Sequence, residues 1–270
     1  PPAGRGFPIS CCRVQNMPNN PTKDTRHVSP HPPLPEYYQS EVQHRRFLSQ
    51  VFDETAGNYD WIDNMMSFGS GVWYRRDALK RAGLSAGMSH LDVAVGTGAI
   101  ARSAVDIVGA SGSVLGLDPS MGMLQQAVRS ARIPVIQGVA ERLPLPDPAF
   151  QFLSMGYALR HVADLRTTFD EYARVLKPGG KLLILEFAQP KSRLGYAVGR
   201  FYLNRVVPWL SQVGSGKKQA RVLMEYCWQT VDNFVPGKDI LEALAASGFV
   251  DATRRTWFGV FSEYVARKPD

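Results

Sequence analysis

The chain has 270 residues, of which 44% are hydrophobic and 20% charged, and its formal net charge is +7. This composition is sufficient for a packed core and excludes a disordered or fibrous protein. No stretch reaches the roughly 18 to 20 apolar residues that cross a bilayer, and no apolar signal core is present, so we expect a soluble protein of the cytoplasm, or of the mitochondrial matrix in a eukaryote.

Residues 1–35 are rich in Pro, Ser, Asn and Arg and follow neither a helical nor a strand period. We therefore predict a disordered leader, followed by a single domain at 36–270. Because the chain starts with Pro and Met17 could be the natural start, residues 1–16 are interpreted as an expression remnant or upstream translation. A mitochondrial transit peptide is the rival interpretation, although no amphipathic Arg-rich helix is present.

Two predicted helices come first, at Val42–Asn58 and Gly71–Ala82, and a regular alternation of strands and helices follows. The alternating segments are strand Ser89–Ala94, helix Ala99–Val108, strand Ser113–Asp118, a helix from the capping Ser120 to about Ser130, strand Ile133–Gln137, strand Phe150–Tyr157, helix Leu165–Leu176 and strand Lys181–Phe187. Lys177–Gly180 is predicted to be a turn. This alternation predicts a Rossmann-like α/β fold, with a mostly parallel sheet covered by helices on both faces.

Two further helical patterns, Arg193–Leu210 and Lys217–Val231, interrupt this alternation without a strand between them. The apolar residues that recur at helical spacing in the first pattern are Tyr196, Phe201, Tyr202, Val206, Trp209 and Leu210. An insertion at about 192–231, directly after the fifth strand, is expected to cover the ligand crevice of an open α/β sheet. A last helix at Ile240–Ser247 and two strands within Phe249–Arg267 complete a seven-stranded sheet.

A short motif points to the ligand. A strand that contains Asp92 leads into the turn Gly96-Thr97-Gly98, and Asp118 closes the next strand 20 residues after Gly98. Glycines let the backbone approach a ligand closely, and an acid at the second strand end can accept hydrogen bonds from ribose hydroxyls. A nicotinamide cofactor would favour a third glycine where this chain has Ala99–Ala101, and no GK[ST] follows for a phosphate loop. S-adenosylmethionine fits better, because it has a ribose and an adenine but no pyrophosphate.

Five segments, taken in order, closely resemble the ubiquinone and menaquinone biosynthesis C-methyltransferases, the UbiE family, over about Val51 to Lys268. They are LDVAVGTG, LGLDPSMGML, GVAERLPLPDPAF, YALRHVADL and RVLKPGGKLLILEF. GTG and LDPSM occur in many methyltransferases, whereas ALRHVAD followed by RVLKPGGKLLILEF is more specific. The resemblance implies a class I methyltransferase fold, S-adenosylmethionine as cofactor, and a lipophilic quinol of the demethylmenaquinol or polyprenyl-benzoquinol type as substrate.

The same resemblance implies the cofactor-binding residues. Thr97 and its flanking glycines fall beside the methionine part, Asp118 on the ribose, and Val139 and Ala140 beside the adenine, although the family usually has Asp or Asn where this chain has Val139. The full set is Tyr59, Asp92, Ala94, Gly96, Thr97, Gly98, Asp118, Pro119, Met123, Val139, Ala140, Glu141 and Gly156.

Three residues are the implied catalytic candidates: Arg160, His161 and Tyr59. Arg160 would stabilise the phenolate and His161 would accept the phenolic proton, directly or through water. Tyr59 would belong, with Asp60 and Asp63, to a lid over the cofactor. The alternatives are that Arg160 pairs with Asp164, that His161 is a buried imidazole with its hydrogen bonds satisfied, and that Tyr59 packs under a loop.

Departures from the family pattern affect the substrate side. His161 stands where the family normally has Asn, and Gly71 and Tyr74 stand where it has His and Trp. Two alternatives therefore remain beside quinol C-methylation. One is methylation of another lipophilic aromatic or natural product at oxygen, nitrogen or carbon, and the other is a non-catalytic homologue that binds S-adenosylmethionine.

The remaining expectations concern partners. No Lys/Arg block interleaved with aromatic residues is present, so nucleic-acid binding is not expected. From Lys191 onward, twelve basic residues stand against seven acidic ones, a bias that suits either an anionic membrane surface or an ordinary solvated face. A homodimer is also left open. Three cysteines without a CxxC pair, and His27, His31 and His44 without ligand spacing, predict neither disulfides nor a metal site.

Overall fold

The computed structural model of the chain describes residues 27–66, 69–189, 192–207, 209, 218–257 and 259–270. Within this part, one seven-stranded sheet has the spatial order β3-β2-β1-β4-β5-β7-β6. Its strands are β1 (Ser89–Val93), β2 (Ser113–Asp118), β3 (Val135–Gln137), β4 (Phe150–Gly156), β5 (Leu176–Phe187), β6 (Val250–Trp257) and β7 (Phe261–Arg267). Only β7 runs antiparallel to its neighbours, so the predicted Rossmann-like fold with a mostly parallel sheet is confirmed.

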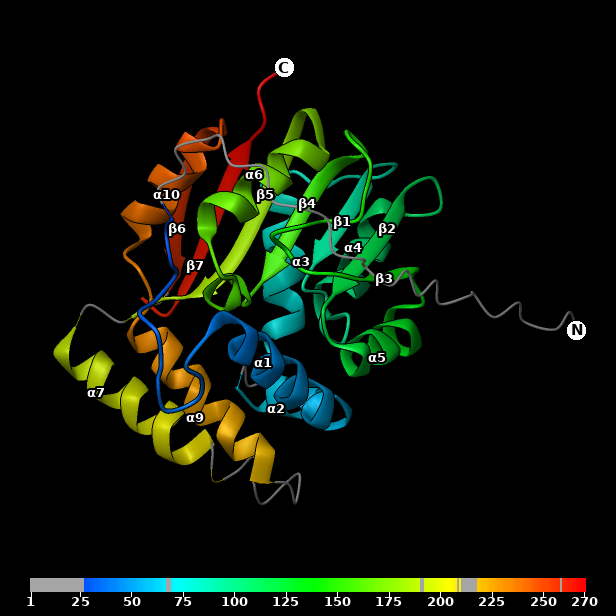
Figure 1. Cartoon of the computed structure of the whole chain (residues 1–270). Helices are drawn as coiled ribbons and strands as arrows, with labels where there is room; N and C mark the ends of the chain where they lie inside the picture. The colour runs from blue at the N-terminus through cyan, green and yellow to red at the C-terminus, as the bar shows by residue number, and fades with distance from the viewer. Residues whose placement is uncertain (1–26, 67–68, 190–191, 208, 210–217, 258) are drawn as a thin grey trace, which may run out of the picture.

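Helices cover both faces of this sheet (Figure 1). One face carries α3 (Gly71–Ala82), α4 (Ala99–Val108) and α5 (Met121–Ala131), and the other carries α6 (Leu165–Val175) and α10 (Gly237–Ala246). Successive residues of a strand serve opposite cores, because side chains alternate across a sheet. Phe152 packs with the α3–α5 side and Leu153 with the α6–α10 side, and both are fully buried. This double burial explains the nearly continuous apolar strands of the sequence.

One predicted turn is wrong. Lys177–Gly180 lies inside β5, where the pairing with β4 jumps from Leu176 to Lys181. The C-terminal tail supplies its backbone partners: Gly179 N donates to Lys268 O at 3.1 Å, and Lys268 N donates to Gly180 O at 2.8 Å. Because those partners are about ninety residues away, the local Pro-Gly-Gly sequence did not reveal the pairing.

A helical cover lies beyond the carboxyl ends of the parallel strands (Figure 1). It consists of α1 (Glu41–Thr55), the 3₁₀ turn Ala56–Asn58, α2 (Tyr59–Met66), α7 (Arg193–Phe201), a π-helical turn at Tyr202–Val206, and α9 (Lys218–Asp232). Val51 of α1, Val207 and the α9 residues Leu223 and Met224 form a separate small core that joins these helices. Among the described residues, no helix combines the length and the apolar composition that a membrane span requires.

The end of the predicted leader belongs to the fold. Val28 N donates to Asp164 Oδ1 at 2.7 Å, Val235 N donates to Pro30 O at 2.9 Å, and Leu34 is buried. The ordered part therefore begins before residue 36, and the prediction of disorder is wrong for residues 27–35. No sequence period could reveal this, because the bonds reach partners more than a hundred residues away. Residues 1–26 of the predicted leader lie outside the described residues.

Candidate active site

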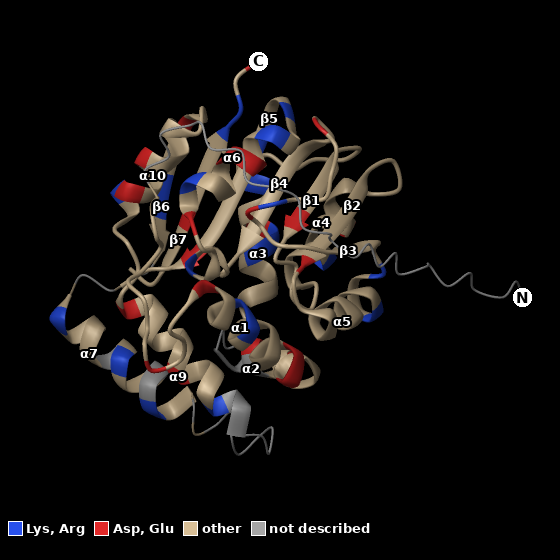
Figure 2. Ribbon diagram, in the orientation of Figure 1, with Lys and Arg blue, Asp and Glu red and all other residues tan. Residues whose placement is uncertain are grey.

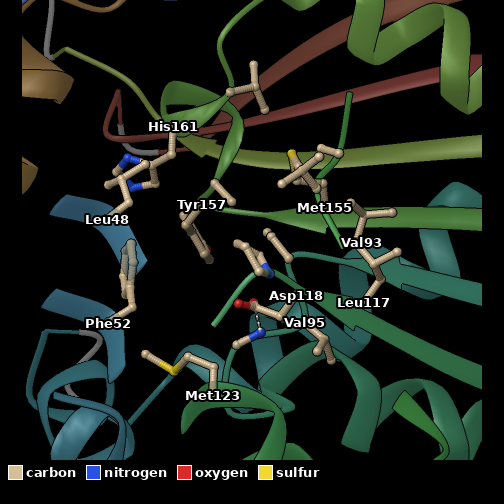
Figure 3. Close-up of a pocket in the computed structure, with 18 of the residues that line it drawn as sticks. Leu48, Phe52, Val93, Val95, Leu117, Asp118, Met123, Met155, Tyr157 and His161 are labelled. Atoms are coloured by element: carbon tan, nitrogen blue, oxygen red, sulfur yellow. Dashed lines mark hydrogen bonds between the residues drawn. The ribbon is translucent and has the colours of Figure 1, made fainter. Parts of the chain in front are cut away.

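A first cavity of about 1320 Å³, counted to its open mouth, lies at the carboxyl ends of β1, β2 and β4. Leu48 and Phe52 of α1 form its opposite wall and face Asp118 across it (Figure 3). The predicted cofactor-binding residues that line it are Tyr59, Asp92, Ala94, Gly96, Thr97, Asp118, Pro119, Met123, Val139, Ala140, Glu141 and Gly156. Segments that are far apart in the sequence thus meet where open α/β sheets bind their ligands.

Gly98 is the one predicted cofactor residue outside this lining. It has φ +89° and begins α4, and a Cβ added there would lie 3.0 Å from Ser130 Oγ and 3.1 Å from Ala131 Cβ of α5. Gly98 is therefore needed for the left-handed backbone and for close packing of α4 on α5. The predicted contact between Gly98 and the cofactor is not supported by this placement.

Asp118 fastens the glycine turn to β2. Gly96 N donates to Asp118 Oδ2 (Figure 3), and Ser120 N donates to Asp118 Oδ1, both at 2.9 Å. Gly96 has φ +55° and open space where a Cβ would be, so the turn leaves room for a ligand. Burial raises the pKa of Asp118 to about 6, against the lowering effect of these two bonds. Since an ionised carboxylate has about four acceptor positions, Asp118 can still accept hydrogen bonds from a diol.

Asp92 carries a buried oxygen that lacks a partner. Its Oδ1 accepts from Ser154 Oγ at 2.7 Å, whereas its Oδ2 has no hydrogen-bond partner among the described residues. Ser154 Oγ lies 2.8 Å from His90 Nε2, which must donate because the hydroxyl proton goes to Asp92. Burial raises the pKa of Asp92 to about 7 and lowers that of His90 to about 3. Asp92 lines the first cavity, where its carboxylate favours a cationic or N–H ligand, although the Ala101 backbone also acts on this carboxylate and lowers its pKa.

The N-terminal helices close over this cavity through polar contacts. Thr97 Oγ1 of the glycine turn donates to Asp60 Oδ1 of α2. Asp53 of α1 accepts from Ser120 Oγ at 2.6 Å and from Gly122 N at 2.8 Å, at the start of α5. α2, which carries Tyr59, Asp60 and Asp63, therefore lies where the resemblance placed a lid, and α1 covers the cavity beside it.

A second cavity of about 1140 Å³ adjoins the first and shares Tyr59, Asp63, Arg75 and Tyr157 with it. Its remaining wall is largely aromatic and apolar, and is formed by Gly71, Trp73, Tyr74, Phe187, Met224, Cys227, Trp257 and Phe261, together with Ser70, Arg81 and Arg160. Gly71 and Tyr74, two departures from the UbiE pattern, thus line this cavity, whereas Val139 and His161, two further departures, line the first. The two cavities are therefore adjoining candidate ligand sites that share one wall.

The charges of the two cavities differ. Every arginine that lines the second cavity is paired with a carboxylate: Arg75 with Asp63 at 2.5 Å, Arg81 with Glu263 at 2.6 Å, and Arg160 with Glu186 at 2.6 Å. In the first cavity, Asp92 and Asp118 have no Lys or Arg partner among the described residues. The second cavity is thus close to electrically neutral, and the first carries carboxylates available to a cation.

Arg160 is held in place from the protein side. It is 4% exposed, and its Nη1 donates to Glu186 Oε1 and to Tyr157 O, both at 2.6 Å. Asp164 instead begins α6, where it accepts from Thr167 N at 2.9 Å. The alternative pairing of Arg160 with Asp164 is therefore wrong, and the guanidinium belongs to the second cavity.

His161 belongs to the first cavity, so the adjacent residues Arg160 and His161 serve different sites. The His161 ring stacks on Tyr226 at 5.5 Å and meets Phe52 edge-on at 5.6 Å. Burial, and then the neighbouring Arg160 charge, lowers the pKa of His161 well below its ordinary value. The imidazole is neutral near pH 7 and is a weak proton acceptor.

The helical cover differs from its prediction. Phe201 and Trp209 are 64% and 63% exposed, and neither lines the first or the second cavity. Tyr196 contacts Trp228 of α9 at 6.0 Å, and α9 itself supplies the cavity residues Met224 and Cys227. The helical spacing of the apolar residues predicted that α7 is a helix, but it did not predict which of its faces would pack against the protein. Leu210, predicted with this group, lies outside the described residues.

Three functional residues escaped sequence reasoning: Arg75, Tyr157 and Glu186. Tyr157 adopts φ +58° at the end of β4, as Ala94 adopts φ +55° just after β1, and such backbone is concentrated at ligand sites. Nothing local to the sequence marks Arg75. Glu186 did carry a signal, because it is the one acidic residue in the apolar strand KLLILEF and therefore needed a buried cation.

Comparisons with known proteins agree with this geometry. Residues 39–268 match the ubiE/COQ5 methyltransferase family. The chain is 34% identical over 241 residues to a demethylmenaquinone methyltransferase of Geobacillus sp. (strain WCH70), which covers 86% of this chain and 99% of the relative. It is 32% identical to the ubiquinone/menaquinone biosynthesis C-methyltransferase UbiE of Geobacter sulfurreducens, over 82% of this chain and 88% of the relative.

Solved structures share the fold. Phosphoethanolamine N-methyltransferase 2 of Haemonchus contortus, in a complex with S-adenosyl-L-methionine, matches with a TM-score of 0.60 at 19% identity, over 84% of this chain and 60% of that one. A SAM-dependent methyltransferase of Aquifex aeolicus matches with a TM-score of 0.53 at 19% identity, over 72% and 88% of the two chains.

Proposed function

Since the chain belongs to the ubiE/COQ5 methyltransferase family and is an S-adenosylmethionine-dependent methyltransferase, we propose that it methylates a lipophilic quinol at a ring carbon. The observation that carries this proposal is the charge contrast between two adjoining cavities. A cationic ligand fits the cavity with unpaired carboxylates, and a neutral aromatic ligand fits the cavity whose charges are paired.

The first cavity fits S-adenosylmethionine. This cofactor carries an ammonium and a sulfonium, and Asp92 offers a buried oxygen without a partner on the cavity wall. Asp118 retains free acceptor positions for the ribose diol, as the sequence predicts. When bound, S-adenosylmethionine supplies a methyl group that is electrophilic because it is attached to a sulfonium. The protein has to align the acceptor with that methyl group and exclude water.

The second cavity fits the acceptor. Its aromatic wall suits a flat, apolar ring, and no unpaired charge there would have to be desolvated by a neutral ligand. Two relatives are named for demethylmenaquinone and for ubiquinone/menaquinone biosynthesis, which supports a demethylmenaquinol or polyprenyl-benzoquinol type of acceptor.

The groups on the common wall can prepare the acceptor. Asp63 can accept the phenolic proton, and the adjacent Arg75 stabilises the resulting phenolate. Electron density then moves to the ortho carbon, which bonds to the methyl group as the bond between that methyl group and the sulfonium sulfur breaks and S-adenosylhomocysteine leaves. The ring carbon loses its proton to solvent, which restores the aromatic ring, and the phenolate takes back the proton from Asp63, so that one proton is released for each methyl group transferred. We assign the first proton to Asp63 rather than to His161, because Asp63 lines both cavities and His161 lines only the first.

Arg160 supports the same step from the second cavity. Its Nη1 is held by Glu186 and Tyr157, whereas its Nε is buried without a partner among the described residues. That N–H group is a donor available to a quinol oxygen, which agrees with the predicted stabilisation of negative charge by Arg160. Tyr59 and Tyr157 line both cavities, so they lie at the boundary that the methyl group has to cross.

A labelled transfer reaction tests the proposal. Purified protein receives S-adenosylmethionine with a deuterated methyl group and a short-tailed demethylmenaquinol kept reduced under anaerobic conditions, and mass spectrometry locates the label. We expect the label on a ring carbon. The oxidised quinone is the matched control, and it should give no product because it has no phenolic proton to lose. Label on oxygen, or on another lipophilic aromatic from a lipid extract, would replace the quinol assignment, and binding without any transfer would identify a non-catalytic homologue.

A further inference from the structure

The outermost helix of the cover exposes large apolar side chains. Leu194 is 76% exposed, Phe201 64% and Trp209 63%. Leu194 and Phe201 are seven residues apart, so they lie on one face of α7. Single exposed apolar residues are ordinary, but three along one short segment mark an interaction surface.

The same segment is strongly cationic. Between Glu186 and Glu225 the sequence contains seven basic residues and no acidic one. Arg193, Arg200 and Arg205 are exposed, and none of them has an ion pair with another described residue. Figure 2 shows Lys and Arg along α7 with no Asp or Glu on that helix. No neighbouring carboxylate therefore neutralises this charge.

The cationic and apolar side chains form a single stripe. Arg193 and Arg200 have the same seven-residue spacing as Leu194 and Phe201, whereas Tyr196 turns inward onto Trp228 of α9. A shallow surface hollow brings two of these guanidinium groups beside aromatic rings, and it is lined by Tyr196, Ala197, Arg200, Phe201 and Arg205. Such a hollow offers charge to a phosphate group and apolar surface to the acyl chain beneath it.

We propose that this stripe, formed by Arg193, Leu194, Arg200 and Phe201 of α7 and by Arg205 and Trp209 beyond it, docks on a bilayer that contains anionic phospholipids. Aromatic and aliphatic side chains insert at the headgroup level, and the guanidinium groups contact the phosphates. A second copy of the chain on this face would bring like charges together, whereas an anionic bilayer complements them. Docking requires no particular acceptor, so it stands apart from the quinol assignment.

Vesicle sedimentation with the full chain tests the proposal. The probes are vesicles of phosphatidylcholine alone and vesicles that also contain phosphatidylglycerol. We expect at least tenfold stronger partitioning onto the anionic vesicles, weakening as salt is added. The triple variant Arg193→Gln, Arg200→Gln, Arg205→Gln should lower partitioning by about a hundredfold, at about fivefold per charge. Phe201→Ser should lower it about tenfold.

A matched variant separates local docking from net charge. Arg129→Gln, Lys177→Gln, Lys238→Gln removes the same number of exposed positive charges from other parts of the surface. It should keep at least a third of the wild-type partitioning. Equal loss in both triple variants would overturn the proposal, as would equal binding to neutral vesicles.

Sedimentation velocity tests whether a second copy of the chain, rather than a bilayer, binds this face. A dimer that Phe201→Ser converts to a monomer, in a protein that does not bind anionic vesicles, would overturn the proposal and assign the face to a second copy. None of the substituted residues lines the two cavities of the proposed active site. Transfer to a short-tailed quinol in detergent should therefore stay within twofold of wild type, so that failed docking and failed catalysis can be told apart.

Discussion

The two cavities of the active site are built in opposite ways. The first consists mainly of strand ends and the turn between β1 and α4, and its carboxylates Asp92 and Asp118 are buried without cationic partners. The second is assembled from side chains of α2, α3, α9 and three strands, and each arginine on its wall is neutralised by a carboxylate. The carboxylates of the first cavity therefore favour a cationic ligand, whereas the charged groups of the second cavity already neutralise one another within the protein.

This difference predicts which property a substitution should change, ligand affinity in the first cavity and stability in the second. Removing a charge from the first cavity should change ligand affinity, because no buried cation among the described residues is left unpaired by its loss. Removing a charge from the second cavity should change stability, because a buried partner is left unpaired.

The largest expected effect follows from breaking a pair in the second cavity. Arg160→Ala should lower the free energy of unfolding by about 3–5 kcal/mol, since Glu186 would remain as an uncompensated buried charge. Urea unfolding measures the loss. The matched control is the double variant Arg160→Met, Glu186→Leu, which removes both charges and should recover most of the stability. A loss below about 1 kcal/mol in the single variant would show that the pair is not structurally important.

The same variant separates structure from catalysis. In protein that remains folded, Arg160→Ala should lower the single-turnover rate of methyl transfer by about a hundredfold, as expected for the loss of one preorganised donor. Arg160→Lys should recover only part of the rate, because a compact ammonium cannot reproduce the planar guanidinium. Normal turnover in a stable variant would leave Arg160 with a structural role alone.

The next effect concerns affinity in the first cavity. Asp118→Ala should weaken S-adenosylmethionine binding by about 1.5 to 3 kcal/mol, or roughly 10- to 150-fold, because charge-assisted hydrogen bonds to the ribose are lost. Calorimetry on the folded variant gives the dissociation constant. Asp106→Ala, which changes an exposed carboxylate of α4, is the control and should bind normally. An unchanged constant for Asp118→Ala would remove this residue from the site.

A smaller effect should appear with pH. Because burial raises the pKa of Asp92 to about 7, affinity for the cationic cofactor should rise about tenfold from pH 6 to pH 8 as this group ionises. The folded pKa lies above the unfolded value of about 3.9, so the contribution of Asp92 to the stability of the ligand-free protein should fall as pH rises from about 4 to about 7. Asp92→Asn should remove the rise in affinity between pH 6 and pH 8 and the part of the stability profile that belongs to Asp92, whereas Asp118, whose pKa is raised to about 6, keeps its own part. Calorimetry and thermal melts at each pH can check both. A pH-independent dissociation constant in the wild type would contradict the role of Asp92.

The smallest effect tests the cover itself. Tyr226→Phe removes the hydrogen bond between Tyr226 Oη and His44 Nε2 of α1, which is 3.0 Å long and buried. Unfolding free energy should fall by about 1 kcal/mol, since one buried polar group loses its partner. The dissociation constant for S-adenosylmethionine should stay within twofold of wild type. A larger change in affinity would show that the Tyr226–His44 hydrogen bond positions the wall that α1 contributes to the first cavity.

The sequence by itself was sufficient to predict the mostly parallel sheet, the glycine turn at Gly96–Gly98 and the cofactor. Strand and helix periods, Ser120 as a helix cap and the spacing from Gly98 to Asp118 are local signals, because each depends on residues close together in the chain. The backbone turn at Gly96 needs a glycine for its own conformation, so the cofactor site could be read before the fold was known. The family resemblance extended that reading to the residues on β4 and after β3.

Only the tertiary structure decided the acceptor side. The partner of Arg160 is Glu186, which a different strand brings within 2.6 Å, and no spacing rule distinguishes it from the nearer Asp164. Packing on α9 decided which face of α7 is covered. Phe201 and Trp209 therefore remain exposed to solvent, although their helical spacing had suggested a buried face. Pairing of distant charges and the choice of a covered face depend on contacts between elements, and a linear pattern does not record those contacts.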